Sequence, residues 1–246
     1  MINIVVPMAG LGSRFAIAGY EKPKPFIDVL GKPMIERVME NVQLPNARFI
    51  LIGRKEHLIQ EALLIEQIKI RYPNTIFIGL DKLTEGTACT VLFAKRYIDN
   101  EDPLLIANSD QLVDIDLNLF FQDCINRNLD GSILTFKDAE MNPKWSFVKT
   151  NESGIALVVK EKEAISSDAT VGIYLYSKGK DFVNAAIQMI IENDRVNNEF
   201  YTCPTYNYAI GLGKKIGIYE IPVNSMHGLG TPSDLSSYIV HIKSQP

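Results

Sequence analysis

The chain has 246 residues, 46% of them hydrophobic and 22% charged, which is typical of a globular protein with a sizeable core. A formal net charge of −4 argues against a general nucleic-acid binder, because such proteins usually carry a basic face. The three cysteines are scattered and form no CxxC pair, which argues against a disulfide framework. No apolar run is long enough to span a bilayer. Since no secretory leader pattern is present, we expect a cytoplasmic protein without membrane or nucleic-acid partners.

In the first half of the chain, short apolar runs alternate with helical patterns, as in βα units with a largely parallel sheet. Strands are expected at residues 2–6, 49–52, 75–78 and 104–107. Helices are expected from Pro33 and after Gly86. A third helix is expected between them, and its apolar face would consist of Leu58, Ile59, Ala62, Leu63 and Ile65. The polar residues that follow the strands indicate a ligand site at the carboxyl edge of the sheet.

The second half has shorter strands separated by loops, which indicates a mixed or antiparallel region. Strands are expected at residues 132–136, 147–149, 156–160, 171–176 and 216–221, and helices at 180–191, 201–210 and 232–242. No linker or repeat divides the chain, so residues 1–246 are expected to form a single domain. The predicted class is α/β, with a Rossmann-like, mostly parallel mixed sheet flanked by helices and a small β-rich extension.

The loop after the first strand is cationic in an otherwise acidic chain. Its glycines let backbone N–H groups approach phosphate oxygens, and Arg14 offers a two-pronged guanidinium. A dinucleotide fingerprint fails here because Phe15 replaces the third glycine and no helix is expected to start directly. A P-loop fails because Pro33 follows Gly31-Lys32. What remains is either a polyphosphate site or a plain strand-to-helix turn with a surface arginine.

The segments PMAGLGSRF and KPKPFIDVLGKPMI, in this order and at this separation, resemble the signature of the sugar-nucleotidyltransferase family, which makes nucleoside-diphosphate sugars and related metabolites. The resemblance implies a GT-A-like fold with a nucleotide-binding part (1–130) and an acceptor-binding part (131–246). It also implies that Arg14 binds the departing pyrophosphate and that Lys24 bridges the reacting phosphates. The nucleotide contacts implied are Ala9, Gly10, Gly12 and Ser13. Lys22 and Lys32 could equally be solvated charges.

Residues 81–88 resemble the loop with which this family reads the nucleobase, with Gly86 and Thr87 at its helix start. The family often has Gln where this chain has Asp81. An ionised carboxylate only accepts hydrogen bonds, and cytosine offers an amine donor, so Asp81 favours CTP as the nucleotide partner. Adenine also offers an amine, and a simple turn residue is an equal alternative for Asp81.

Asp110, at the end of the strand 104–107, resembles the family's metal-binding aspartate, which implies Mg²⁺ as cofactor. A second carboxylate is expected near the C-terminus, but Gly228 stands at that position. Either Asp110 works with substrate phosphates and water alone, or His227 or a carboxylate from elsewhere takes over. For His227 itself, a polar loop residue is the plainer interpretation.

The segments KEK and ATVGIY resemble the family's acceptor-binding motifs. By that resemblance Glu161 accepts hydrogen bonds from the acceptor, Lys162 holds its phosphate, and Gly172 lies in the adjoining strand. Without the family, this charge run is an ordinary solvated face. Trp145, the only tryptophan, is expected either to stack on the acceptor or to pack in the core.

The resulting hypothesis is a Mg²⁺-dependent nucleotidylyltransferase that joins an NTP to a small phosphorylated acceptor and releases pyrophosphate. The PMAG opening resembles capsule-associated members, and a homo-oligomer is left open. Asp114-Ile115-Asp116 is a DxD motif, so a GT-A glycosyltransferase is the first alternative. The second is a nucleotide sensor without turnover, which Gly228 keeps open.

Overall fold

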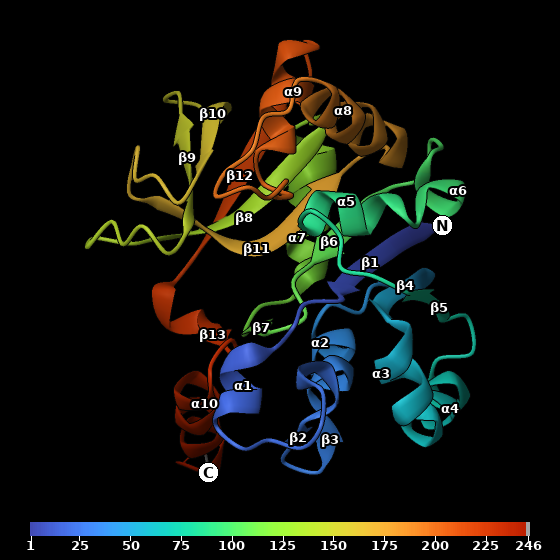
Figure 1. Ribbon diagram of the computed structural model, residues 1–246. Coiled ribbons are helices and arrows are strands. Elements are labelled where there is room, and N and C mark those ends of the chain that lie inside the picture. Colours follow the sequence, from blue (N-terminus) through green and yellow to red (C-terminus); the bar gives the residue numbers. More distant parts are fainter. Residues whose placement is uncertain (245–246) are drawn as a thin grey trace.

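The computed structural model describes residues 1–244 and places nine strands in one mixed sheet, with helices on both of its faces (Figure 1). Four parallel strands form one half in the order β6-β1-β4-β5. Their bounds are Ile2–Met8 (β1), Ala47–Arg54 (β4), Ile76–Leu80 (β5) and Leu104–Ala107 (β6). The four strands expected in the first half are confirmed, and β6 has the expected bounds.

The second half of the sheet is added next to β6 through β11, which runs antiparallel to it. β11 also pairs antiparallel with β8, and β8 pairs parallel with β12. The outer hairpin β9–β10 meets the start of β11 through one pair, Ala169 opposite Phe147. The bounds are Gly131–Lys137 (β8), Ser146–Thr150 (β9), Ala156–Glu161 (β10), Asp168–Tyr176 (β11) and Ile216–Ile221 (β12). The sheet therefore contains strands from both sides of residue 130.

Helices cover both faces because alternate side chains of the central strands point to opposite sides. Ile4 and Val6 of β1 belong to one buried cluster and Val5 to the other. The first cluster packs under α2, α4 and α7, and the second under α5, α6, α8 and α9. The helix bounds are α2 Met34–Asn41, α4 Ala62–Arg71, α5 Thr87–Leu92, α6 Lys95–Ile98, α7 Leu117–Asn126, α8 Gly179–Ile191 and α9 Thr205–Gly211.

Three sequence expectations about helices were wrong. α1 (Ser13–Ile17) begins directly after Gly12, where no helix was expected, and α7 was not expected at all. The predicted apolar face at 58–65 does not exist as one stripe, because α3 (Lys55–Gln60) ends before α4 begins. Ile59 and Leu63 are 69% and 83% exposed as a result.

Two small ribbons and two short 3₁₀ turns complete the chain. β2 (Asp28–Val29) pairs with β3 (Lys32–Pro33), and β7 (Gln111–Val113) pairs antiparallel with β13 (Met226–Gly228). The turns are η1 (Lys24–Phe26) and η2 (Val223–Ser225), and α10 (Pro232–Ser244) packs beside β13, away from β10 (Figure 1). Among residues 1–244, none of the helices is long and apolar enough to cross a membrane.

Candidate active site

The loop after β1 is shaped by Gly12, whose backbone has φ +62°. A Cβ at this position would lie 3.0 Å from Cβ of Lys24, so a glycine lets the loop approach the turn η1 closely. Phe15 is buried beneath the loop, whereas Ser13 and Arg14 are exposed. The Arg14 guanidinium makes no hydrogen bond or ion pair with the other residues up to 244, so it is available to an anionic ligand.

Lys24 and Asp110 form a salt bridge between Nζ and Oδ2, although 86 residues separate them. Both side chains are partly buried, at 17% and 26% exposure. The Lys24 ammonium also lies 5.8 Å from the ring centroid of Phe15. The cationic loop and the carboxylate after β6 thus meet at one point above the carboxyl edge of the parallel strands.

Gly228 also lies beside Asp110. It pairs with Gln111 across the β7–β13 ribbon, and the next residue, Leu229, donates its N–H to the Asp110 carbonyl at 2.7 Å. The expected second carboxylate position is therefore next to the first, but it carries no side chain.

Asp234, in the first turn of α10, reaches the space beside this glycine. Its Cγ is 4.0 Å from where a Cβ on Gly228 would lie. The Cβ position on Gly230 is 3.3 Å from Oδ2 of Asp110 and 3.7 Å from Oδ2 of Asp234. Sequence reasoning did not find Asp234, because an acidic residue shortly after Thr231 is the pattern of an ordinary helix start. The structure agrees with that pattern, since the Asp234 backbone N–H donates to Thr231 Oγ1 at 3.1 Å. Its position after Gly230-Thr231 was the available signal.

Two lysines of the same N-terminal loop point elsewhere. Lys22 pairs with Glu61 at 3.3 Å, and Lys32 pairs with Glu40 at 2.5 Å. The structure thus brings only Lys24 of the three lysines to Asp110, and the solvated-charge interpretation fits the other two.

The predicted nucleobase loop is held by Gly86, which has φ +129°. A Cβ here would lie 2.4 Å from the Phe200 carbonyl oxygen, so only glycine fits. Phe200 donates its N–H to Glu85 O at 2.7 Å, and Ala88 donates to Phe200 O at 2.9 Å. Thr87 Oγ1 accepts the N–H of Thr202 at 3.1 Å. The loop is therefore tied to residues 199–202.

Asp81 lies at the outer end of this loop. Its carboxylate accepts a hydrogen bond from Lys55 Nζ at 3.0 Å, and its side chain is 76% exposed. Asp81 also lines a cavity of about 530 Å³, whose apolar wall includes Leu83, Phe93 and Phe200.

The motifs predicted to bind the acceptor meet at the end of β10. The Glu161 carboxylate accepts a hydrogen bond from the Ser146 hydroxyl, and burial raises the pKa of Glu161 above its ordinary value. Lys162 has φ +57° and donates its backbone N–H to the Trp145 carbonyl at 3.0 Å. The Lys162 ammonium contacts the Tyr201 hydroxyl and lies 4.3 Å from the centre of its ring. Three segments distant in sequence thus build one polar wall.

Trp145 adjoins this wall, whereas Gly172 lies in β11 next to the turn after β6. The indole packs edge-on against Phe136, 5.4 Å between ring centroids, and joins the first core cluster. Gly172 has φ +90°, and a Cβ there would lie 1.9 Å from Oε1 of Gln111 and 2.3 Å from Nδ2 of Asn108. The Gly172 carbonyl accepts the Asn108 N–H at 2.9 Å, so β11 touches the turn that carries Asp110.

The carboxylates of the DxD motif have other partners. Asp114 Oδ2 is 2.6 Å from His227 Nε2, and Asp116 caps α7 by accepting the Asn118 N–H at 2.9 Å. A capping role accounts for the second of these aspartates.

Comparison with known proteins places this chain in a family. The model of the nucleotidyl transferase family matches residues 4–205, so the chain belongs to that family. It is 25% identical over 242 residues to "Bifunctional protein GlmU" of Caldanaerobacter subterraneus subsp. tengcongensis, covering 95% of this chain and 50% of the relative. It is 24% identical over 179 residues to the mannose-1-phosphate guanylyltransferase catalytic subunit beta of Drosophila melanogaster, covering 70% and 47%.

The chain thus spans about half the length of the curated relatives that it matches. Among solved structures, the nucleoside-diphosphate-sugar pyrophosphorylase from Vibrio cholerae RC9 is similar with a TM-score of 0.81 and 24% identity, covering 96% of this chain and 99% of that one. This likeness confirms the predicted α/β fold, with a mixed, mostly parallel sheet between helices.

Proposed function

We propose that the chain is a Mg²⁺-dependent nucleotidylyltransferase that transfers a nucleoside monophosphate from an NTP to the phosphate of a small acceptor and releases pyrophosphate. The observation that carries the proposal is the meeting of Lys24 with Asp110 in a chain of the nucleotidyl transferase family. This contact brings the cation that we propose to bind phosphate next to the carboxylate that we propose to bind the metal. We also propose that the chain works as one domain, with its nucleotide part before residue 131 and its acceptor part after it.

The residues around Asp110 fit a hard divalent cation. Oδ2 of Asp110 and Oδ2 of Asp234 lie 3.3 Å and 3.7 Å from the position that a Cβ on Gly230 would take, so the two carboxylates are close to each other. Their oxygens are the ligands that Mg²⁺ prefers, and this ion commonly binds one or two carboxylates together with water and phosphate oxygens. Asp110 would be the primary ligand, and Asp234 would supply the second negative charge that Gly228 does not. When bound, the ion neutralises charge that develops on the reacting phosphates.

The chain's own residues would act by positioning and electrostatics, so no covalent nucleophile is required. Lys24, held by Asp110 before the nucleotide binds, would turn to the α-phosphate. Arg14, exposed beside it, would hold the pyrophosphate that leaves. The backbone N–H groups of residues 9–13 would contact the nucleotide, and the acceptor phosphate would attack in line from the side opposite the leaving group.

The polar wall would orient the acceptor. Lys162 carries the positive charge suited to an acceptor phosphate, while Glu161 accepts hydrogen bonds from its hydroxyl or amine groups. Gly172 would allow this wall to lie against the Asp110 turn, because any side chain there would push the two apart. Trp145 packs against the core with one edge, so its remaining surface would shape the pocket rather than close it.

For the nucleotide we favour CTP, since the Asp81 carboxylate can accept from the exocyclic amine of cytosine. Gly86 and Thr87 would place this loop against the base. For the acceptor, a specific candidate is phosphoglutamine, which would make the chain a CTP:phosphoglutamine cytidylyltransferase of capsule precursor synthesis. A sugar 1-phosphate is the alternative that the names of the relatives support, and phosphocholine is a third.

The test measures pyrophosphate release from each of the four NTPs, paired with phosphoglutamine, sugar 1-phosphates or phosphocholine. We expect Mg²⁺-dependent release with one acceptor class, fastest with CTP. Consumption of a nucleotide-sugar donor without pyrophosphate release would identify a glycosyltransferase instead, and nucleotide binding without either reaction would identify a sensor. Asp81→Asn should weaken the preference for CTP, and an unchanged NTP profile would contradict the assignment of Asp81.

The metal assignment is tested separately with Mn²⁺ in place of Mg²⁺, followed by electron paramagnetic resonance in the presence of nucleotide. Asp110→Ala should abolish turnover and Mn²⁺ binding while circular dichroism stays unchanged. Asp234→Asn should weaken Mn²⁺ binding about tenfold or more, as expected for the loss of a charged ligand. Asp99→Asn, which removes the carboxylate that follows the last residue of α6, is the charge-matched control and should behave as wild type. Normal Mn²⁺ binding by Asp234→Asn would remove that residue from the site.

A further inference from the structure

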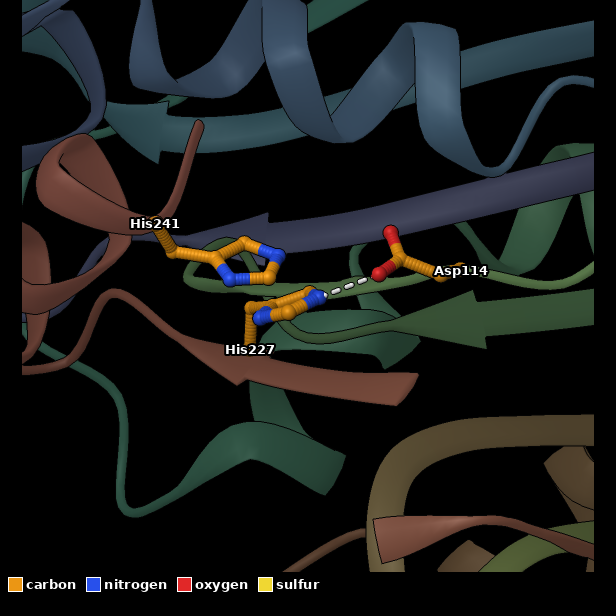
Figure 2. Close-up of side chains that lie close together, drawn as sticks. All are labelled: Asp114, His227 and His241. Carbon is orange, nitrogen blue, oxygen red and sulfur yellow. Dashed lines mark hydrogen bonds and ion pairs between the residues drawn. The ribbon is translucent and has the colours of Figure 1, made fainter. Parts of the chain in front are cut away.

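Three side chains from different elements converge at the far end of the β7–β13 ribbon (Figure 2). Asp114 follows β7, His227 lies in β13, and His241 lies on α10. One ligand atom from each of the three lies within 4.8 Å of the other two. Figure 2 shows the two imidazole rings and the carboxylate directed toward a common region. The proposed nucleotide site uses none of these residues.

The backbone fixes two of the three in place. Asp114 donates its N–H to the Ser225 carbonyl at 2.8 Å, which extends the ribbon beyond its last strand pair. His227 is opposite Leu112 in the register, and its Nε2 is 2.6 Å from Oδ2 of Asp114. The His227 side chain is 12% exposed, whereas that of Asp114 is 55% exposed. The cluster is therefore held from beneath and accessible to an ion from solvent.

The helix α10 brings the third member. The rings of His227 and His241 lie 4.8 Å apart between centroids and are inclined by 32°. Tyr238, one turn earlier on α10, lies 5.5 Å from the His227 ring. The two histidines are thus packed side by side, each with ring nitrogens near the same carboxylate.

Two imidazoles and one carboxylate form the donor set of three-ligand zinc sites, in which water occupies the fourth position. In a tetrahedral site with bonds of about 2.0–2.1 Å, ligand atoms are about 3.3 Å apart. The present separations, between 2.6 Å and 4.8 Å, bracket that value. Small side-chain rotations would therefore replace the His227–Asp114 hydrogen bond by two bonds to one ion, with release of the shared proton.

The cluster differs from the proposed Mg²⁺ site in place and in chemistry. Four residues of extended chain separate Asp114 from Asp110, or about 13 Å. Imidazole nitrogens select zinc-class ions, whereas carboxylates and phosphates select Mg²⁺. Occupation of one site thus does not require occupation of the other.

We propose that Asp114, His227 and His241 bind one zinc-class divalent ion, which fastens α10 to the β7–β13 ribbon. The ribbon continues directly into Leu229, whose N–H holds the Asp110 carbonyl at 2.7 Å. Fastening α10 also fixes Asp234, which lies two turns before His241 on the same helix. The ion would therefore stabilise the surroundings of Asp110 without contacting any substrate. This site goes beyond the proposed transferase activity and does not depend on it.

The test is a Zn²⁺ titration of the chelator-treated full chain by calorimetry, with Co²⁺ as a spectroscopic probe. We expect one equivalent of Zn²⁺ and visible Co²⁺ absorption bands typical of a four-coordinate site. His241→Ala and Asp114→Asn should each lower the affinity by at least tenfold. His57→Ala, which removes the third histidine of the chain, on α3, is the matched control and should bind as wild type.

The outcomes separate this site from the catalytic proposal. Asp110→Ala should lose Mn²⁺ binding but keep its Zn²⁺ equivalent. If wild type takes up no Zn²⁺ at micromolar concentration, the cluster is only the His227–Asp114 pair with a neighbouring histidine, and the proposal is wrong. Equal binding by wild type and His241→Ala would refute it as well. His241→Asn, a milder change, serves if the alanine variant loses its native circular dichroism.

Discussion

Gly172 lets β11 lie close to the Asp110 turn, so we expect Gly172→Ala to be strongly destabilising. Its φ of +90° is costly for alanine, about 1–2 kcal/mol. The added Cβ would lie 1.9 Å from Oε1 of Gln111 and 2.3 Å from Nδ2 of Asn108, too close for either atom to stay in place.

The displaced side chains hydrogen-bond to each other at 2.9 Å, and losing that bond costs about 0.5–1.5 kcal/mol. Together the two effects predict a loss of about 1.5–3.5 kcal/mol in the free energy of unfolding. For a chain of this size, that corresponds to a lower Tm by about 3–14 °C. The measurement is urea unfolding followed by circular dichroism, with a thermal melt alongside.

Gly213→Ala is the control that separates backbone strain from collision. Gly213 has a similar φ of +79°, but no atom lies within 4 Å of the Cβ that it would gain. It should therefore lose only the strain component, about 1–2 kcal/mol. If the two variants are equally stable, the collision at Gly172 does not exist in solution and the proposed contact between β11 and the Asp110 turn is wrong.

Two further predictions concern carboxylates away from that contact. Glu36 is 1% exposed and pairs with Arg71 at 2.5 Å, so Arg71→Met should cost about 1.5–3 kcal/mol in urea unfolding; a neutral effect would contradict the pairing. For Glu161, burial raises the pKa, so the native state binds a proton more tightly than the unfolded chain. Wild-type stability should therefore fall relative to Glu161→Gln as pH rises from the ordinary value of 4.5 through the raised pKa, and parallel stability curves would exclude this burial effect.

Most strands could be predicted from the sequence because their patterns are local. Residues 104–107 and 216–221 are short apolar or β-branched runs with polar neighbours, and β6 and β12 have the same bounds. The helix face at 58–65 was wrong for a physical reason. Glu61 has φ −104° and ψ +29°, which interrupts the helix and resets the phase of the apolar residues beyond it. Periodicity alone does not detect such a break.

The missed helix α7 has a different cause. Asp116 was assigned to a DxD metal motif, although Asp at an N-cap followed by an apolar run is also a helix-start signal. The structure shows the cap, because Asp116 accepts the Asn118 N–H at 2.9 Å. One side chain fitted two patterns, and only the fold distinguishes them.

For the site, the order of the motifs pointed to residues that contact each other in the structure, as Lys24 and Asp110 do. It was silent on Asp234, because its proximity to Gly228 depends on how α10 turns back toward the ribbon. The absence of a carboxylate at Gly228 was visible in the sequence, but the proximity of Asp234 to this position was not. The histidine cluster likewise depends on three elements that meet only in the fold.

The ties between residues 85–88 and 200–202 have a consequence for motion. Thr87 and Thr202 are 115 residues apart in sequence, yet their segments share two backbone–backbone hydrogen bonds around Gly86 and a third from the Thr202 N–H to the Thr87 hydroxyl. Neither segment can move away from the other without breaking these hydrogen bonds. Amide hydrogen exchange should therefore show the N–H groups of Ala88 and Phe200 opening together, as one cooperative unit. A ligand that orders residues 85–88 would thereby also order residues 200–202.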